Sequence, residues 1–270
     1  MTAGGQEPAP QAADLAELAE IAAAVAGAAP RAAVPFAAPL LLFARLGADE
    51  RTAVFAPRPG RMLVQDSLSL EAVDRLVPGE ALAVRRADPV AGRADGPFLF
   101  DVALTRTGGP TIATVKAGLS LLPTEAVVRA EGLAPPRARP GETEHRLEIV
   151  PIVQEVVDRW LRLVGDDNPV HGPGFRDVVP ESAAPIVPGA LLAAAAEAIV
   201  GRVVSGRVLR MTARFAATIA IGEAVSVDVV ERAAPEGVEA RPIRLQFARA
   251  NGRIAALIDL TIGCAGPIRG

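Results

Sequence analysis

The residues best suited to chemistry lie in one short stretch in the second half of the chain. Asp166 and His171 stand on either side of an Asn168-Pro169 pair, and residues 185–189 read Pro-Ile-Val-Pro-Gly. An imidazole exchanges protons near neutral pH, and a neighbouring carboxylate can orient both the ring and a water molecule. Because proline fixes φ and ends a helix, both side chains can face one cavity from a single turn. The spacing therefore predicts an acid–base pair.

The Pro-Ile-Val-Pro-Gly run predicts a helix that begins at Gly189. The first N–H groups of a helix have no partner within it, and the helix dipole favours negative charge at that end. Glycine also permits close approach of a substrate atom. Adding water to an α,β-unsaturated thioester requires an acid–base group and a donor for the charge that builds on the thioester oxygen. The two motifs together point to this reaction or its reverse.

The same residues resemble the signature of the MaoC-like (R)-specific enoyl-thioester hydratases. That signature is a helix ending in Gly-Asp-x-Asn-Pro-x-His, then a loop, then Pro-Ile-Val-x-Gly at the start of a long central helix. The resemblance to the catalytic hotdog unit covers residues 145–263, and a weaker one to the non-catalytic hotdog of the same family covers residues 34–123. It implies an α+β double-hotdog fold, in which two curved antiparallel sheets each wrap around a central helix.

The resemblance also implies roles for individual residues. Asp166 and His171 would jointly hold a water, Asn168 would orient the motif, and the backbone N–H of Gly189 would donate to the thioester oxygen. The family commonly has histidine where this chain has Pro188, which offers neither a side-chain donor nor an N–H. The sequence therefore departs from the family at the point where the thioester would be positioned.

Three alternative readings stay open. Asp166 and Asn168 could merely brace a turn, with His171 an ordinary loop residue. Glu197 lies inside the apolar helical run. Because hotdog thioesterases use a helix carboxylate, Glu197 supports acyl thioester hydrolysis. The other interpretation of Glu197 is a charge at a solvated helix edge near Arg202. The third reading is an acyl-binding hotdog subunit without turnover.

The chain also resembles itself at an offset of about 143 residues. Residues 77–84 match residues 220–227, and the Gly-Gly turn at 108–109 falls on the Asn-Gly turn at 251–252. The same offset places Ala23 opposite the catalytic Asp and Ala28 opposite the catalytic His. We therefore expect the first unit to be catalytically silent, to pair its sheet with the second unit and to shape the acyl tunnel.

Hydrophobic periodicity supplies the remaining elements. Helices are expected over residues 15–25, 153–163 and 186–203. Alternating or β-branched runs predict strands over residues 98–104, 112–121, 225–229, 243–247 and 258–262. The predicted organisation is a disordered tail (1–13), a non-catalytic hotdog (14–134), a linker (135–144) and a catalytic hotdog (145–270). His145, the other histidine, falls at the linker and is expected to be exposed and incidental.

Composition excludes several classes of function. The net charge is −3 and there is no basic run, so nucleic acid is not an expected partner. Cys264 is the single cysteine and there are two histidines, so neither a disulfide nor a Cys/His zinc site is expected. The apolar run is interrupted by charges and the N-terminus lacks a secretory signal, so we expect a cytoplasmic protein without a membrane span.

The expected substrate is an acyl thioester of coenzyme A or of acyl carrier protein, and no metal or redox cofactor is expected. The sequence leaves the oligomeric state open, with a homodimer as one expectation because dimers are the commonest symmetric assemblies.

Overall fold

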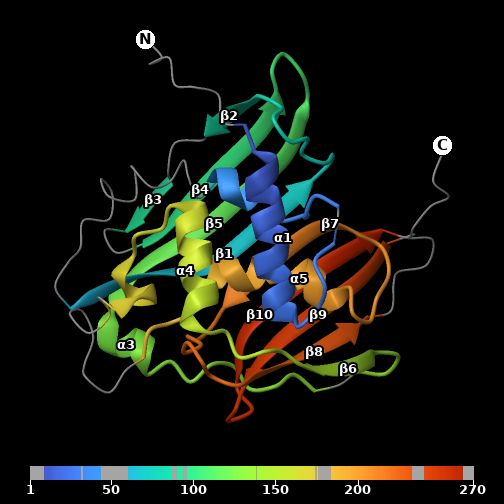
Figure 1. Ribbon diagram of the computed structural model, residues 1–270. Helices are drawn as coiled ribbons and strands as arrows, with labels where there is room; N and C mark the ends of the chain where they lie inside the picture. Colours follow the sequence, from blue (N-terminus) through green and yellow to red (C-terminus); the bar gives the residue numbers. More distant parts are fainter. Residues whose placement is uncertain are drawn as a thin grey trace.

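The described residues form one antiparallel sheet of ten strands with helices on one of its faces (Figure 1). The computed structural model describes residues 9–31, 33–43, 60–86, 90–93, 96–137, 139–173, 175, 184–232 and 240–263. Along the sheet the strand order is β2-β4-β5-β1-β7-β10-β9-β8-β6, and β3 pairs with β4. The strands are β1 (Arg61–Ala72), β2 (Leu82–Arg86), β3 (Val90–Arg93), β4 (Gly96–Arg106), β5 (Thr111–Pro123), β6 (Thr143–Glu148), β7 (Arg207–Phe215), β8 (Val225–Glu231), β9 (Ala240–Arg249) and β10 (Ile254–Gly263).

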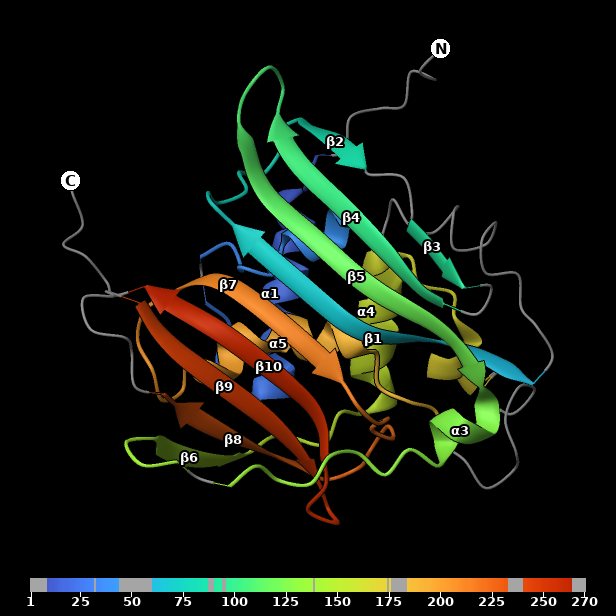
Figure 2. The same cartoon turned by 180° about the vertical axis from the view of Figure 1, so that it is seen from behind.

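The two halves of the chain meet at the pairing of β1 with β7, which lie side by side in Figure 2. Ser67 to Glu71 pair with Arg214 to Arg210 in antiparallel register. The first half supplies β1 to β5, and the second supplies β7 to β10 with β6 at the far edge. The two sheets are therefore joined edge to edge, as predicted.

Helices α1 and α4 cover the concave side of the sheet together with α5, which lies at its centre (Figure 1). Helix α1 contacts both of the other two, and Arg159 on α4 forms a bidentate ion pair with Glu17 on α1, at 2.7 and 2.9 Å. Apolar side chains from both halves belong to one hydrophobic core. The helices are α1 (Ala12–Ala26), α3 (Thr124–Val128), α4 (Gln154–Val164) and α5 (Gly189–Val200), with a 3-10 turn η1 (Pro169–His171).

The internal repeat extends to its ion pairs. Glu80 accepts a hydrogen bond from Nε of Arg106 at 2.8 Å, and Glu223 accepts one from Nε of Arg249 at 2.8 Å. Glu80 lies just before β2 and Arg106 ends β4, while Glu223 lies just before β8 and Arg249 ends β9. Corresponding residues are separated by the same 143 positions. The repeat therefore includes side-chain contacts as well as strand order.

Several predicted boundaries differ from the structure. Helix α1 begins at Ala12, inside the segment predicted to be a tail, and β6 begins at Thr143, inside the segment predicted to be a linker. The predicted helix over residues 186–203 is shorter, because α5 spans only Gly189–Val200. Strands β8, β9 and β10 contain the three predicted alternating runs. Cys264 lies outside the described residues.

Candidate active site

The turn after α4 holds the predicted Asp and Asn close together. Helix α4 ends at Gly165, whose φ of 68° is a left-handed conformation that suits glycine. Oδ1 of Asp166 accepts a hydrogen bond from the backbone N–H of Asn168 at 3.1 Å, and Oδ1 of Asn168 accepts one from Val170 at 3.3 Å. Both side chains therefore brace the turn, as one alternative reading held, and both also line the main cavity.

His171 is held by one contact to its ring and one to its backbone. Its side chain is buried, with 8% of the residue exposed, and Nδ1 lies 2.8 Å from the carbonyl oxygen of Ile186. A carbonyl can only accept, so Nδ1 carries the hydrogen and the neutral ring keeps its lone pair on Nε2. The backbone oxygen of His171 accepts a hydrogen bond from Nε2 of Gln154 at 2.9 Å. The ring is thus fixed in the tautomer that an Nε2 base requires.

The start of α5 completes this wall of the cavity. Pro188 is the N-cap residue and Gly189 is the first helical residue, so the N–H of Gly189 has no partner within the helix. A Cβ atom at Gly189 would lie 3.0 to 3.1 Å from three ring carbons of Phe215. Glycine therefore avoids crowding against Phe215 at a helix start that lines the cavity.

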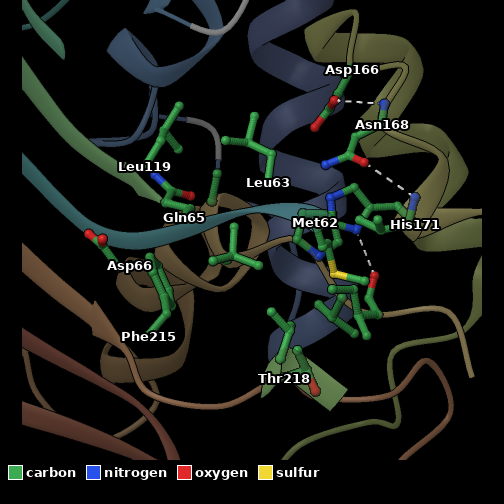
Figure 3. Close-up of a pocket in the computed structure, with 18 of the residues that line it drawn as sticks. Met62, Leu63, Gln65, Asp66, Leu119, Asp166, Asn168, His171, Phe215 and Thr218 are labelled. Carbon is green, nitrogen blue, oxygen red and sulfur yellow. Dashed lines mark hydrogen bonds between the residues drawn. The ribbon is translucent and has the colours of Figure 1, made fainter. Parts of the chain in front are cut away.

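A single cavity of about 460 Å³ brings these groups together. Asp166, Asn168, His171 and Gly189 all line it, and Figure 3 shows the first three on one wall. Strand β1 from the first half of the chain also lines the cavity; in the same view Gln65 lies across the cavity from Asp166, whereas Met62 lies beside His171. The cavity is large enough for a small-molecule ligand and mostly apolar. Its lining residues come from both halves of the chain.

Glu197 lies in a different place from the other predicted site residues. Its Oε2 accepts a hydrogen bond from the backbone N–H of Phe36 at 2.6 Å, and it lines a separate, small cavity beside Arg75 and Arg207. Burial raises the pKa of Glu197, although the N–H of Phe36 and nearby arginines oppose that rise. The expected solvated helix edge is therefore wrong, and Arg202 instead donates to backbone carbonyls.

The helix caps correct the predicted correspondence between the two halves. Helix α1 ends at Gly27 with φ 60° just as α4 ends at Gly165, so these two caps are equivalent. Counting onward from the caps makes Ala28 and Ala33 the counterparts of the predicted catalytic pair. The sequence offset had placed Ala23 and Ala28 there, because it took no account of the different loop lengths.

The first half also differs at the position that corresponds to Gly189. Residues 35–39 read Pro-Phe-Ala-Ala-Pro and precede an apolar helical segment, as residues 185–189 do in the second half. In this alignment Pro39 takes the place of Gly189, and proline has no N–H to donate. The described part of the first half therefore lacks an acid–base pair and an amide donor at the corresponding position.

Sequence reasoning missed two residues that support the site. Gln154 links the first turn of α4 to the backbone of His171, and Trp160 of the same helix lines the cavity. Both fall in the predicted helix over residues 153–163, and an amphipathic pattern places Trp160 on its buried face. No local signal identifies the partner of Gln154, which lies across a turn.

His145 is exposed on the edge strand β6, away from the cavity. Among the described residues, no group of three His, Cys, Asp or Glu side chains is arranged to hold a metal ion. In the same part of the chain, no helix has the length and apolar character needed to cross a membrane.

No protein-family model matches the chain, and no curated protein matches its sequence. The structure is similar to that of a MaoC-like dehydratase from Phytophthora capsici, at 15% identity and a TM-score of 0.66 over 97% of this chain and 98% of that one. HtdX from Mycobacterium tuberculosis aligns at 20% identity and a TM-score of 0.63, over 95% and 98% of the two chains.

The same fold also occurs in a protein of another class. The 12:0-ACP thioesterase from Umbellularia californica aligns at 9% identity and a TM-score of 0.55, over 86% of this chain and 91% of that one. These likenesses establish architecture, and at such low identity the chemistry has to be inferred from the site. The predicted α+β double hotdog is confirmed, and the chain has the fold of the MaoC-like dehydratases.

Proposed function

We propose that this protein catalyses the reversible addition of water to trans-2-enoyl thioesters, giving (R)-3-hydroxyacyl thioesters carried by coenzyme A or acyl carrier protein. The observation that carries the proposal is that His171, whose ring Nδ1 is bound to the Ile186 carbonyl, lines the same cavity as Asp166 and Gly189. Asp166 lines the same cavity on the same wall. The stereochemistry comes from the resemblance to the MaoC-like hydratases.

The proposed step needs only groups of this chain. A water donates one hydrogen to the carboxylate of Asp166 and the other to Nε2 of His171. As Nε2 takes its proton, the water oxygen bonds to the β-carbon, and the double-bond electrons move toward the thioester oxygen. The N–H of Gly189 donates to that oxygen and stabilises the charge. His171 then returns the proton to the α-carbon, so one water has been added across the double bond without metal or redox cofactor.

The structure gives less support to hydrolysis of the thioester by Glu197. That carboxylate does not line the cavity of His171 and Gly189, and its Oε2 is already bonded to the Phe36 N–H. Burial also raises the pKa of Glu197, although the Phe36 N–H and nearby arginines oppose the rise. The fold itself does not separate the two activities, since a thioesterase shares it.

The proposal is tested by substituting the acid–base pair. Asp166→Asn and His171→Ala should each lower turnover of an enoyl thioester by about two to four orders of magnitude, while the melting temperature stays close to that of the wild type. Asp74→Asn and His145→Ala are matched controls, because they make the same chemical changes at exposed positions that do not line the cavity. Turnover is followed by the loss of the ultraviolet absorbance of the enoyl group.

Two results would contradict the proposal. Near-normal turnover in either variant of the pair would remove the assigned roles. Hydrolysis of a saturated acyl thioester without any change in enoyl absorbance would point to thioesterase activity, and binding of both thioesters without conversion would point to an acyl-binding subunit.

A further inference from the structure

Where β1 pairs with β5, one polar side chain, Gln65, lies among three leucines of the cavity wall; Arg61 and Asp66 of β1 also line the cavity. In the pairing of β1 with β5, Gln65 stands opposite Leu119, and Leu63 stands opposite Leu121 on the same face. All four residues line the cavity. Figure 3 shows Gln65 next to Leu119, across the cavity from Asp166. An amide is thus presented to the space that an acyl chain would occupy.

A β-bulge causes Gln65 to face inward. The register of β1 against β5 shifts between Gln65 and Ser67, which leaves Asp66 as the extra residue. Side chains alternate along a strand, so without the extra residue Asp66 would stand opposite Leu119 and Gln65 would face the other way. Bulges commonly redirect a side chain next to an active site.

The bulge is stabilised by specific contacts. The carboxylate of Asp66 accepts hydrogen bonds from the hydroxyls of Ser67 at 2.9 Å and Ser120 at 2.7 Å. Across the pair stands Gly118, where a Cβ atom would collide with Oδ1 of Asp66 and Oγ of Ser67. Two serines and a glycine therefore keep this irregularity in place, and with it the position of Gln65.

The amide of Gln65 has no hydrogen-bond partner within the part of the chain that the structure describes. A polar group in apolar surroundings costs free energy unless a partner satisfies it, and a few such groups usually decide which ligands a mostly apolar pocket accepts. An amide can both donate and accept. The missing partner is therefore best sought in the ligand.

We propose that Gln65 selects acyl groups that carry a hydrogen-bonding substituent, a hydroxyl or a carbonyl, on the chain beyond the reacting double bond. The inference rests on the proposed function, because it places the acyl chain of an enoyl thioester in this cavity. The side-chain oxygen of Gln65 accepts from a hydroxyl, and its NH₂ group donates to a carbonyl. A plain alkyl chain leaves the amide unsatisfied and is the poorer substrate.

The test compares a plain substrate with polar ones, in the wild type and in Gln65→Met. The plain substrate is trans-2-decenoyl-CoA, and the polar substrates are the same compound with a hydroxyl or a keto group at successive carbons beyond the double bond. The wild type should prefer at least one polar member by about tenfold or more in kcat/KM. Gln65→Met keeps the length of the side chain without the amide. It should lower kcat/KM for that member by about 10- to 100-fold and change the rate with the plain chain by less than about threefold.

Other outcomes overturn the inference in distinguishable ways. Equal losses on plain and polar chains in Gln65→Met would mean that Gln65 contacts the coenzyme A portion that both substrates share. An unchanged preference would mean that Gln65 selects nothing. Gln11→Met makes the same chemical change at an exposed position before α1 and should leave both rates unchanged.

A binding readout keeps the inference separate from the proposed function. Trp160, the single tryptophan of the chain, lines the cavity, so its fluorescence reports occupancy without turnover. Saturated decanoyl-CoA and its hydroxylated forms should show the same preference, and Gln65→Met should abolish it. Failure of every enoyl thioester to react would reject the proposed function, whereas a lack of preference in the fluorescence titration would reject the role of Gln65.

Discussion

Substituting Gly189 by alanine tests whether the first N–H of α5 stabilises the thioester oxygen. The substitution keeps the N–H and adds only a methyl group. Its backbone φ lies outside the positive range that disfavours side chains, so alanine can adopt the same conformation. Any loss of activity would therefore come from crowding at this point of the cavity, where the new methyl group meets Phe215.

The structure sets the size of the expected effect. The added Cβ would lie 3.0 to 3.1 Å from three ring carbons of Phe215, whereas carbon atoms normally rest about 3.5–4.0 Å apart. Either the ring or the helix start must therefore move by about 0.5 Å. A displacement of this order at a reacting group is expected to lower kcat/KM by about 10- to 100-fold.

The expected cost in stability is small by comparison. Overpacking typically costs about 1–3 kcal/mol, and replacing glycine by alanine recovers about 0.4–1 kcal/mol through the unfolded state. The variant should therefore lose about 1–2 kcal/mol, which lowers the melting temperature by about 2–6 °C for a chain of this size. Activity should consequently fall much more than stability at the assay temperature.

The assay is the enoyl absorbance measured at saturating and limiting substrate, with two controls. Gly172→Ala adds a methyl group where nothing lies within 4 Å and should leave the rate unchanged. Phe215→Leu should restore part of the activity when combined with Gly189→Ala, because the smaller side chain relieves the contact. Wild-type kcat/KM in Gly189→Ala alone would refute the placement of the thioester oxygen at this N–H.

Two further predictions concern stability and pH. Because burial raises the pKa of Glu197, the protein loses stability as the pH rises through that raised pKa. Glu197→Gln should therefore raise the melting temperature at pH 7–8 and leave it unchanged below about pH 4. The rate of enoyl hydration should not change. Hydrogen bonds from Arg159 lower the pKa of Glu17, so its stabilisation is present at neutral pH and is lost as the pH falls through that lowered pKa. Glu17→Gln should cost no more than about 1 kcal/mol at pH 7, and denaturant unfolding should show the difference shrinking as the pH falls below the ordinary glutamate pKa of about 4.3.

The sequence predicts those parts of the site that depend on short-range geometry. Asp166, Asn168 and His171 belong to one turn, so their spacing alone brings them together, and the Pro-Gly pair at 188–189 marks the start of a helix. The alternation in β8, β9 and β10 predicts strands for the same reason, because each pattern is complete within a few residues.

Contacts between distant segments could not be predicted in this way. The hydrogen-bond donor to Glu197 is the backbone N–H of Phe36, 161 residues away. The apolar helical run around Glu197 shows that a carboxylate is unusual there, but it does not show which group donates to it. The bulge in β1 reverses the expected inside–outside pattern at Gln65, and no run of residues signals the extra position. A single offset likewise failed at the helix caps, because insertions accumulate in loops and not in strands.

The pairing of β1 with β7 joins the two halves of the chain, so Gln65 and the proposed catalytic pair belong to different repeats. A mutation in the strand around Gln65 alters which molecules are admitted without touching the residues that move protons, about a hundred positions later. The silent repeat thereby becomes free to diversify, and new substrates can be acquired while the chemistry is inherited intact.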